Sequence, residues 1–288
     1  QGARLILTAR GAADLEATAK GLARHSAVFA LPGDVADPAH VTRLVREGEA
    51  RLGPVDVLLN NASDLGATPL PRLQDYPLEA LERTLGTNAV APLRLIQLVL
   101  PGMVARGQGR IVNVTSDAAV EADPGWGGYG ASKAALEGLS RVLGAELEGT
   151  GVTVYAVDPG DMDTAMHREA EPGVDLSDLP SPEAVAPAFL RLITGEALPS
   201  GRYSARDLLP GPAAQPDTAS AAHPASAPQE RRCWTSSSPP TWKPASLPKP
   251  AASPAMASAC SSPTGARTDS STPASPICRR SSIQTTCW

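Results

Sequence analysis

A tyrosine, a lysine and a serine stand at a spacing that suits carbonyl reduction. Tyr129 and Lys133 are four residues apart, so on a helix both side chains lie on one face. A phenol with its ordinary pKa of ~10 is a weak acid–base catalyst at neutral pH, and an adjacent ammonium lowers that pKa. Ser116 closes a strand-like run and can orient a carbonyl oxygen. The pattern predicts that Tyr129 donates a proton to that oxygen while a hydride reaches the carbon; the alternative is a surface Tyr–Lys pair without a role.

Asn88 has a separate physical reason to stand four residues before Pro92. Proline has no N–H, so the carbonyl of residue 88 loses its helical partner. That carbonyl is then free to hold a water molecule near the candidate site. The alternative is a helix kink that serves only packing.

Strand-like and helix-like segments alternate along the first two thirds of the chain. Short apolar runs predict strands over residues 4–9, 28–31, 55–59, 110–115, 152–157 and 201–204. Helical patterns cover residues 12–25, 38–52, 78–104, 128–148 and 181–193. This order predicts an α/β fold with right-handed crossovers and a doubly wound parallel sheet. Ligands bind at the carboxyl ends of such strands, where the candidate residues stand.

Five short motifs in a fixed order then give the chain a family resemblance. They are Asn60-Asn61-Ala62, Thr87-Asn88-Ala89, Thr115-Ser116, Tyr129-x-x-x-Lys133 and Asp158-Pro159-Gly160. With these motifs, residues 2–205 resemble the short-chain dehydrogenase/reductase family. The resemblance implies a Rossmann-like sheet and hydride transfer between a nicotinamide cofactor and a carbonyl or alcohol. It also implies a catalytic set of Asn88, Ser116, Tyr129 and Lys133, in which Lys133 holds the nicotinamide ribose and Asn88 a relay water.

Further positions correspond to cofactor contacts of that family. Asp34 and Val35 match the pair that reads adenine, and Asn60 and Ala62 match the segment beside the adenosine ribose. The nicotinamide loop is matched by Pro159, Gly160, Met162 and Thr164. The alternatives are capping for Asp34 and turn chemistry for Pro159-Gly160.

The end of the first predicted strand indicates which nicotinamide cofactor binds. Family members that use NAD place an acidic residue there for the ribose 2′-hydroxyl. Here the position is Ala9, followed by Arg10. A guanidinium pairs well with a 2′-phosphate, and no carboxylate repels it. The sequence therefore favours NADP(H) over NAD(H), unless Arg10 is merely a solvated residue.

One family feature is missing from the sequence. No T-G-x-x-x-G-x-G loop, which would hold the pyrophosphate at a helix N-terminus, occurs in the chain. We therefore expect an N-terminally incomplete domain over residues 1–212, without the family's first strand and its glycine-rich loop. That strand is central in the fold, so its neighbours are expected to have open edges and an exposed apolar slot.

Residues 213–288 differ in composition from the preceding domain. Ala, Ser, Pro and Thr make up 50 of these 76 residues, and all four cysteines lie here without a zinc-binding spacing. Such a segment buries too little apolar surface to fold, so we expect a dispensable, disordered tail. Three explanations for this segment remain open: a linker, an interaction segment, and translation in a wrong reading frame.

Charge and composition exclude several classes of function. The net charge is −5, which gives no general basic field for nucleic acid. The sequence has no uninterrupted run of about 18 apolar residues, so no membrane span is predicted. No metal site is expected, and the cysteine-free domain favours a cytoplasmic enzyme. The resemblance implies a homodimer or homotetramer.

Three other readings of the sequence remain open. One is a non-catalytic nucleotide-binding regulator, against which the intact Ser116, Tyr129 and Lys133 argue. The others are an inactive fragment and a scaffold that recruits partners through its proline-rich tail. The sequence leaves the substrate open, apart from acidic residues after the nicotinamide loop that argue against a strongly anionic one.

Overall fold

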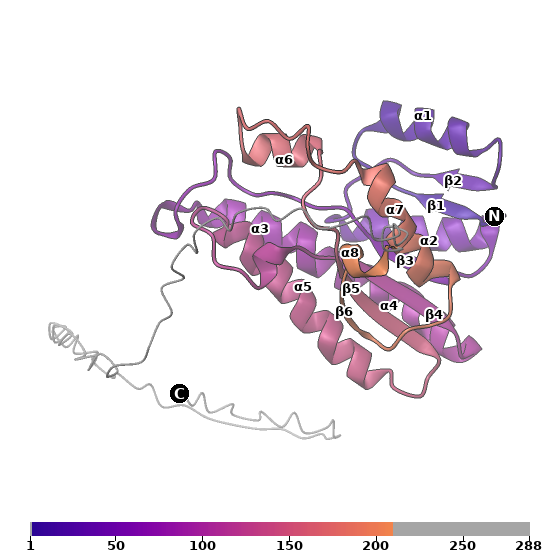
Figure 1. Ribbon diagram of the computed structural model, residues 1–288. Helices are drawn as coiled ribbons and strands as arrows, with labels where there is room; N and C mark the ends of the chain where they lie inside the picture. Colours follow the sequence, from indigo (N-terminus) through magenta and orange to yellow (C-terminus); the bar gives the residue numbers. More distant parts are fainter. Residues whose placement is uncertain (1, 210–288) are drawn as a thin grey trace, which may run out of the picture. The chain divides into compact units, whose positions relative to one another are not determined.

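The computed structural model describes residues 2–209 of the 288-residue chain. The expected tail, residues 213–288, lies outside the described residues. Figure 1 shows strands and helices alternating along the described part. The strands are β1 (Leu5–Leu7), β2 (Val28–Ala30), β3 (Val57–Asn60), β4 (Gly109–Val114), β5 (Val152–Asp158) and β6 (Gly201–Ser204). The helices are α1 (Ala12–Leu22), α2 (Pro38–Leu52), α3 (Leu78–Leu85), α4 (Ala91–Arg106), α5 (Gly127–Glu146), α6 (Ala165–Ala170), α7 (Pro182–Thr194) and α8 (Ala205–Leu208).

The strands form two parallel pieces of sheet. One piece pairs β1 with β2, and the other has the order β3-β4-β5-β6. No ladder joins β1 to β3 within the described residues, and Leu59 on β3 is 45% exposed. Within the described residues β3 is thus an edge strand of the larger sheet, and the predicted N-terminal truncation stays a prediction.

Helices cover both faces of the larger sheet, which makes the fold doubly wound. Ile111 of β4 and Val154 of β5 point into a core with α2, α4 and α5, whereas Val112 and Tyr155 point into a core with α7 and α8. Successive strand residues alternate between the faces, so one apolar run supplies both cores. The predicted α/β Rossmann-like class is confirmed.

Local sequence signals explain where α2 and the long central helix begin and bend. The Asp37 carboxylate accepts a hydrogen bond of 2.9 Å from the Ala39 N–H, and Pro38 follows at the first helical position. The predicted helix over residues 78–104 is interrupted by a π-helical turn at Gly86–Val90. This turn, directly before Pro92, holds Asn88 and often marks a functional site.

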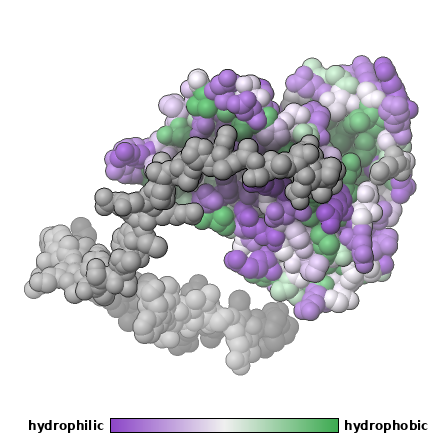
Figure 2. All heavy atoms as spheres, viewed as in Figure 1, coloured by the Kyte–Doolittle hydropathy of each residue, from purple (hydrophilic) through white to green (hydrophobic). Residues whose placement is uncertain are grey.

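The helical stretch from Leu78 to Arg106 is long and apolar enough to cross a membrane, although no uninterrupted apolar run predicted a span. Core helices of globular domains can be equally long and apolar. Here α4 packs on α2, β3 and β4, and Asn88 is buried, so the stretch serves as a core helix of the sheet. On the face in Figure 2, hydrophobic residues occur in small groups among hydrophilic ones.

Candidate active site

The carboxyl ends of β4 and β5, together with α5 and α6, surround a cleft of about 430 Å³. Predicted site residues from three separate segments line it: Ser116, Tyr129, Pro159, Gly160, Met162 and Thr164. The ring of Trp126 also lines the cleft and meets Tyr129 edge to face at 5.7 Å. The parallel sheet therefore brings these residues together at the edge where such folds bind ligands.

Tyr129 and Lys133 lie in the first two turns of α5 and share one helical face. Tyr129 is 9% exposed, and the Lys133 Nζ lies 5.5 Å from the centre of its ring. Burial raises the pKa of Tyr129 above its ordinary value, although the Ser63 hydroxyl acts in the opposite direction. Burial also lowers the pKa of Lys133 to about 8. The expected lowering of the phenol pKa is therefore wrong, because desolvation, the largest influence, and the charges of Asp117 and Asp158 raise it.

Lys133 is a buried donor that lacks a full set of acceptors. The residue is 2% exposed, and within the described residues its ammonium donates one hydrogen bond, to the Val114 carbonyl at 2.8 Å. An ammonium has three donors, and a buried charge is costly without partners. Further acceptors, such as the hydroxyls of a ribose, would fit this group.

Ser116 follows β4 and caps the short 3₁₀ turn at Asp117–Ala119. Its hydroxyl donates to the Asp117 carboxylate at 2.8 Å and accepts from the Ala118 N–H at 3.2 Å. These bonds hold the hydroxyl at the cleft, where it lies close enough to the Tyr129 phenol to lower the pKa of that phenol slightly against the effect of burial. The arrangement can orient a carbonyl oxygen between the two hydroxyls.

Asn88 does not line the cleft but fixes the elements around it. Its side chain accepts from the Asp64 N–H at 2.7 Å and donates to the Asp64 carbonyl and the Ser132 hydroxyl, both at 2.8 Å. The residue is 1% exposed. Asn88 thus joins the loop after β3 to the helix that carries Tyr129, a role that spacing alone did not indicate.

Asn60 ends β3 and belongs to a buried amide chain. It donates to the Asn113 side chain at 2.8 Å, and Asn113 donates to the Ser140 hydroxyl at 2.8 Å. The Asn60 Oδ1 is buried without a hydrogen-bond partner in the described residues. Ala62, two residues further on, lies exposed in the loop after β3.

The residues expected to read the adenosine half of a cofactor follow β1 and β2. Arg10 is exposed just after β1 and forms no ion pair within residues 2–209, so its guanidinium is available to a phosphate. The Asp34 carboxylate accepts from the Ala36 N–H at 2.8 Å and faces solvent, whereas Asp37 rather than Asp34 caps α2, so the helix-capping alternative for Asp34 is wrong. Val35 packs against the core under α2 and α4.

The loop after β5, which the family resemblance matches to a nicotinamide loop, begins with a turn that requires glycine. Gly160 has a φ of +73°, and its N–H donates to the Asp158 carboxylate at 3.0 Å. Thr164 caps α6 by accepting from the His167 N–H at 3.1 Å, and Met162 packs against the core under α7. The capping role of Thr164 and the helix α6 were not predicted from the sequence.

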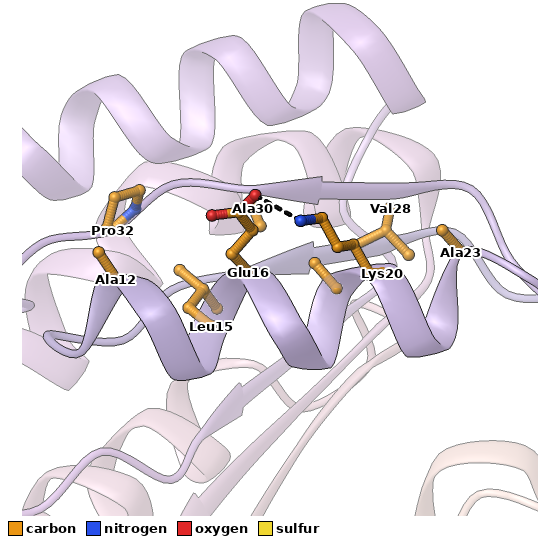
Figure 3. A pocket seen from close by; sticks show the side chains of 9 residues that line it. Ala12, Leu15, Glu16, Lys20, Ala23, Val28, Ala30 and Pro32 are labelled. Atoms are coloured by element: carbon orange, nitrogen blue, oxygen red, sulfur yellow. Dashed lines mark ion pairs between the residues drawn. The ribbon is translucent and has the colours of Figure 1, made fainter.

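A second hollow of similar volume lies between α1 and β2 (Figure 3). Its lining is mostly apolar, and its charged pair, Glu16 and Lys20, forms an exposed ion pair of 2.8 Å. None of the predicted catalytic residues lies there. The chemistry of the described chain is therefore concentrated in the cleft beside Tyr129. Within residues 2–209, no group of three His, Cys, Asp or Glu side chains could hold a metal ion.

The site residues fit the two ends of a nicotinamide dinucleotide. Within residues 2–209, the buried Lys133 ammonium has donors to spare, the buried Asn60 Oδ1 has no hydrogen-bond partner, and Arg10 forms no ion pair. Residues 2–209 contain no glycine-rich loop for the pyrophosphate.

Comparison with known proteins identifies the family. The sequence model described as short chain dehydrogenase matches residues 1–175. A candidate ketoacyl reductase of the monensin polyketide synthase from Streptomyces virginiae is 35% identical over 218 residues, which cover 73% of this chain and 79% of that protein. The ketoacyl reductase HetN of Nostoc is 34% identical over 170 residues, or 57% of each chain.

A solved structure gives the same result. A candidate short chain dehydrogenase from Escherichia coli CFT073, complexed with NADPH, matches with a TM-score of 0.63 and 25% identity, over 71% of this chain and 87% of that one. The chain therefore belongs to the short-chain dehydrogenase family and is an oxidoreductase by that membership.

Proposed function

We propose that the protein reduces a carbonyl compound with NADP(H), or oxidises the corresponding alcohol. Ser116 orients the carbonyl oxygen, and Tyr129 donates the proton to it. Lys133 holds the nicotinamide ribose, and Asn88 keeps the loop after β3 and α5 in register and holds a relay water. The cofactor, when bound, supplies the hydride. The observation that carries the proposal is that Ser116 and Tyr129 line the same cleft, with the buried Lys133 ammonium 5.5 Å from the Tyr129 ring.

The raised pKa of Tyr129 suits the reductive direction. A phenol with a pKa above its ordinary value stays protonated at neutral pH and can act as a general acid. Reduction should therefore fall as the pH rises through that pKa, because the proton donor is lost. Alcohol oxidation, which needs the phenolate, should rise over the same range.

NADP(H) is the proposed cofactor because of residues that follow β1, β2 and β3 and residues that line the cleft after β5. Arg10 would pair with the 2′-phosphate, and Asp34 and Val35 would contact adenine. Asn60 and Ala62 would lie beside the adenosine ribose. At the other end, Pro159, Gly160, Met162 and Thr164 would surround the carboxamide. The related Escherichia coli structure contains NADPH, which supports this choice.

The cleft gives a coarse indication of the substrate. Seven carboxylates and no Lys or Arg line it: Asp117, Asp123, Asp158, Asp161, Glu171, Asp175 and Asp178. Such a field disfavours anions. Trp126 provides an apolar wall. We propose a small neutral or cationic carbonyl compound, in a cytoplasmic enzyme with a cysteine-free catalytic domain.

We also propose that the protein forms a homodimer or homotetramer through α4 and α5. Val104 of α4 and Val142 of α5 are exposed, and Gly138 on α5 has open space around it. Light scattering is expected to give a mass two or four times that of the chain. Replacing Val142 with glutamate should shift the mass toward the monomer, and a parent protein that is already monomeric would contradict the proposal.

The proposed function is tested by following the absorbance of NADPH in the presence of small ketones. Ketone-dependent consumption of NADPH is expected, and much weaker consumption of NADH. Tight NADPH binding without turnover of any carbonyl compound would instead indicate a nucleotide-binding regulator.

A further inference from the structure

Arg202 on β6 connects the middle of α5 with the carboxyl ends of β4 and β5, which form the candidate site. Its Nε donates to the Glu137 carboxylate of α5 at 2.9 Å, and its Nη2 donates to the Asp158 carboxylate of β5 at 3.0 Å. The same Nη2 lies 3.3 Å from the carbonyl oxygen of Ser116, which it approaches as a donor. Glu137 also accepts from the Thr115 hydroxyl at 2.8 Å. One planar guanidinium therefore holds the Ser116 carbonyl directly and the neighbouring Thr115 side chain through Glu137.

We propose that Arg202 is a positioning residue of the active site, which holds Ser116 at the cleft and neutralises the carboxylate of Asp158 beside it. Arg202 is not among the residues that line the cleft, so it acts through Ser116 and Asp158 rather than on a substrate. The role of Arg202 in positioning Ser116 for catalysis rests on the proposed function. Its neutralisation of the Asp158 charge does not, and can be measured in the protein without cofactor.

The charges that face Tyr129 define the electrostatic part. Lys133 faces it from α5, Asp117 from the 3₁₀ turn and Asp158 from β5. Both carboxylates raise the pKa of Tyr129, and the Arg202 charge offsets that of Asp158. Without the guanidinium, the full negative charge of Asp158 acts on the phenol. The pKa of Tyr129 must then rise further, since a nearby anion disfavours the phenolate.

Titration of the cofactor-free protein tests the inference directly. The chain has four tyrosines, so labelling tyrosine with ¹³C at the ring carbon that bears the hydroxyl gives four NMR signals. The Tyr129→Phe variant identifies the signal of Tyr129. In Arg202→Met, we expect the pKa of Tyr129 to rise by about 0.5 to 1 unit. Arg202→Lys, which keeps the charge, should leave the pKa of Tyr129 close to the parent value, and combining Arg202→Met with Asp158→Asn should abolish the rise.

Arg110 of β4 provides a matched control. Its guanidinium also holds backbone carbonyls, those of Leu192 at 2.6 Å and Gly195 at 2.7 Å, but unlike Arg202 it does not bond to Ser116 or Asp158. Arg110→Met should lower thermal stability without moving the Tyr129 titration. An unchanged Tyr129 pKa in Arg202→Met, or an equal rise in Arg110→Met, would overturn the proposal.

Steady-state kinetics of the full-length protein provide the second test of the role of Arg202. In Arg202→Met we expect kcat for ketone reduction to fall about 10- to 100-fold through the displacement of Ser116, with a smaller change in the KM for NADPH. Lysine keeps the charge but lacks the planar fork with which the guanidinium holds its three acceptors. Arg202→Lys should therefore bring the Tyr129 pKa closer to its parent value than it brings kcat. Unchanged kcat in Arg202→Met would refute the role in positioning Ser116. Absence of turnover in the parent would refute the proposed function, while the NMR titration would still decide the electrostatic role.

Discussion

Replacing Tyr129 with phenylalanine is expected to lower ketone reduction by about 10²–10⁴-fold, because the substitution removes the proton donor and little else. The ring of Tyr129 packs against Trp126, and phenylalanine preserves that contact. The dissociation constant for NADPH should therefore stay within a few-fold of the parent value. Steady-state kinetics with one ketone and fluorescence titration with NADPH measure the two quantities.

Tyr203→Phe is a suitable control for this experiment. Tyr203 lies on β6, and its hydroxyl donates to the Pro199 carbonyl at 2.7 Å. Its ring packs edge to face with Tyr155 and does not line the cleft. This variant should keep its turnover. A Tyr129→Phe protein with activity within a few-fold of the parent would show that another group donates the proton.

The second large effect concerns cofactor choice. Arg10→Ala should weaken NADPH binding by about 10- to 100-fold, the range expected for a charge-assisted hydrogen bond to a phosphate. NADH lacks the 2′-phosphate, so its dissociation constant should change little. Calorimetric titration of both cofactors gives the two values.

Arg24, another exposed arginine, lies beyond the C-terminal end of α1 and provides a control that changes charge but not the proposed contact. Arg24→Ala should affect the two cofactors equally and weakly. Equal losses of NADPH and NADH affinity in Arg10→Ala would show that Arg10 does not read the 2′-phosphate.

Local signals in the sequence were sufficient to predict most of the fold. Apolar runs marked the strands, and Asp37-Pro38 marked the start of α2, because both depend on neighbouring residues only. Pro92 indicated a disturbed helix at Asn88, where the structure has a π-helical turn. The short α6 was missed because its residues carry no clear helical period and begin in a loop.

The parts of the site that sequence could not predict depend on distant contacts. Arg202 and Glu137 are 65 residues apart, and the parallel order of β4, β5 and β6 brings them together. The direction of the Tyr129 pKa shift was also missed, since it depends on how deeply α5 buries the phenol. Spacing showed which groups share a helical face but not how much water surrounds them.

The most direct test of the central claim is a hydride-transfer experiment with NADPH that carries deuterium at the transferring position of the nicotinamide. The protein is incubated with this cofactor and a small neutral ketone, and the alcohol product is analysed by mass spectrometry. The proposed function predicts one deuterium on the carbinol carbon and a loss of labelled product in the Tyr129→Phe variant. Bound NADPH that retains its deuterium with every ketone and aldehyde offered would contradict it.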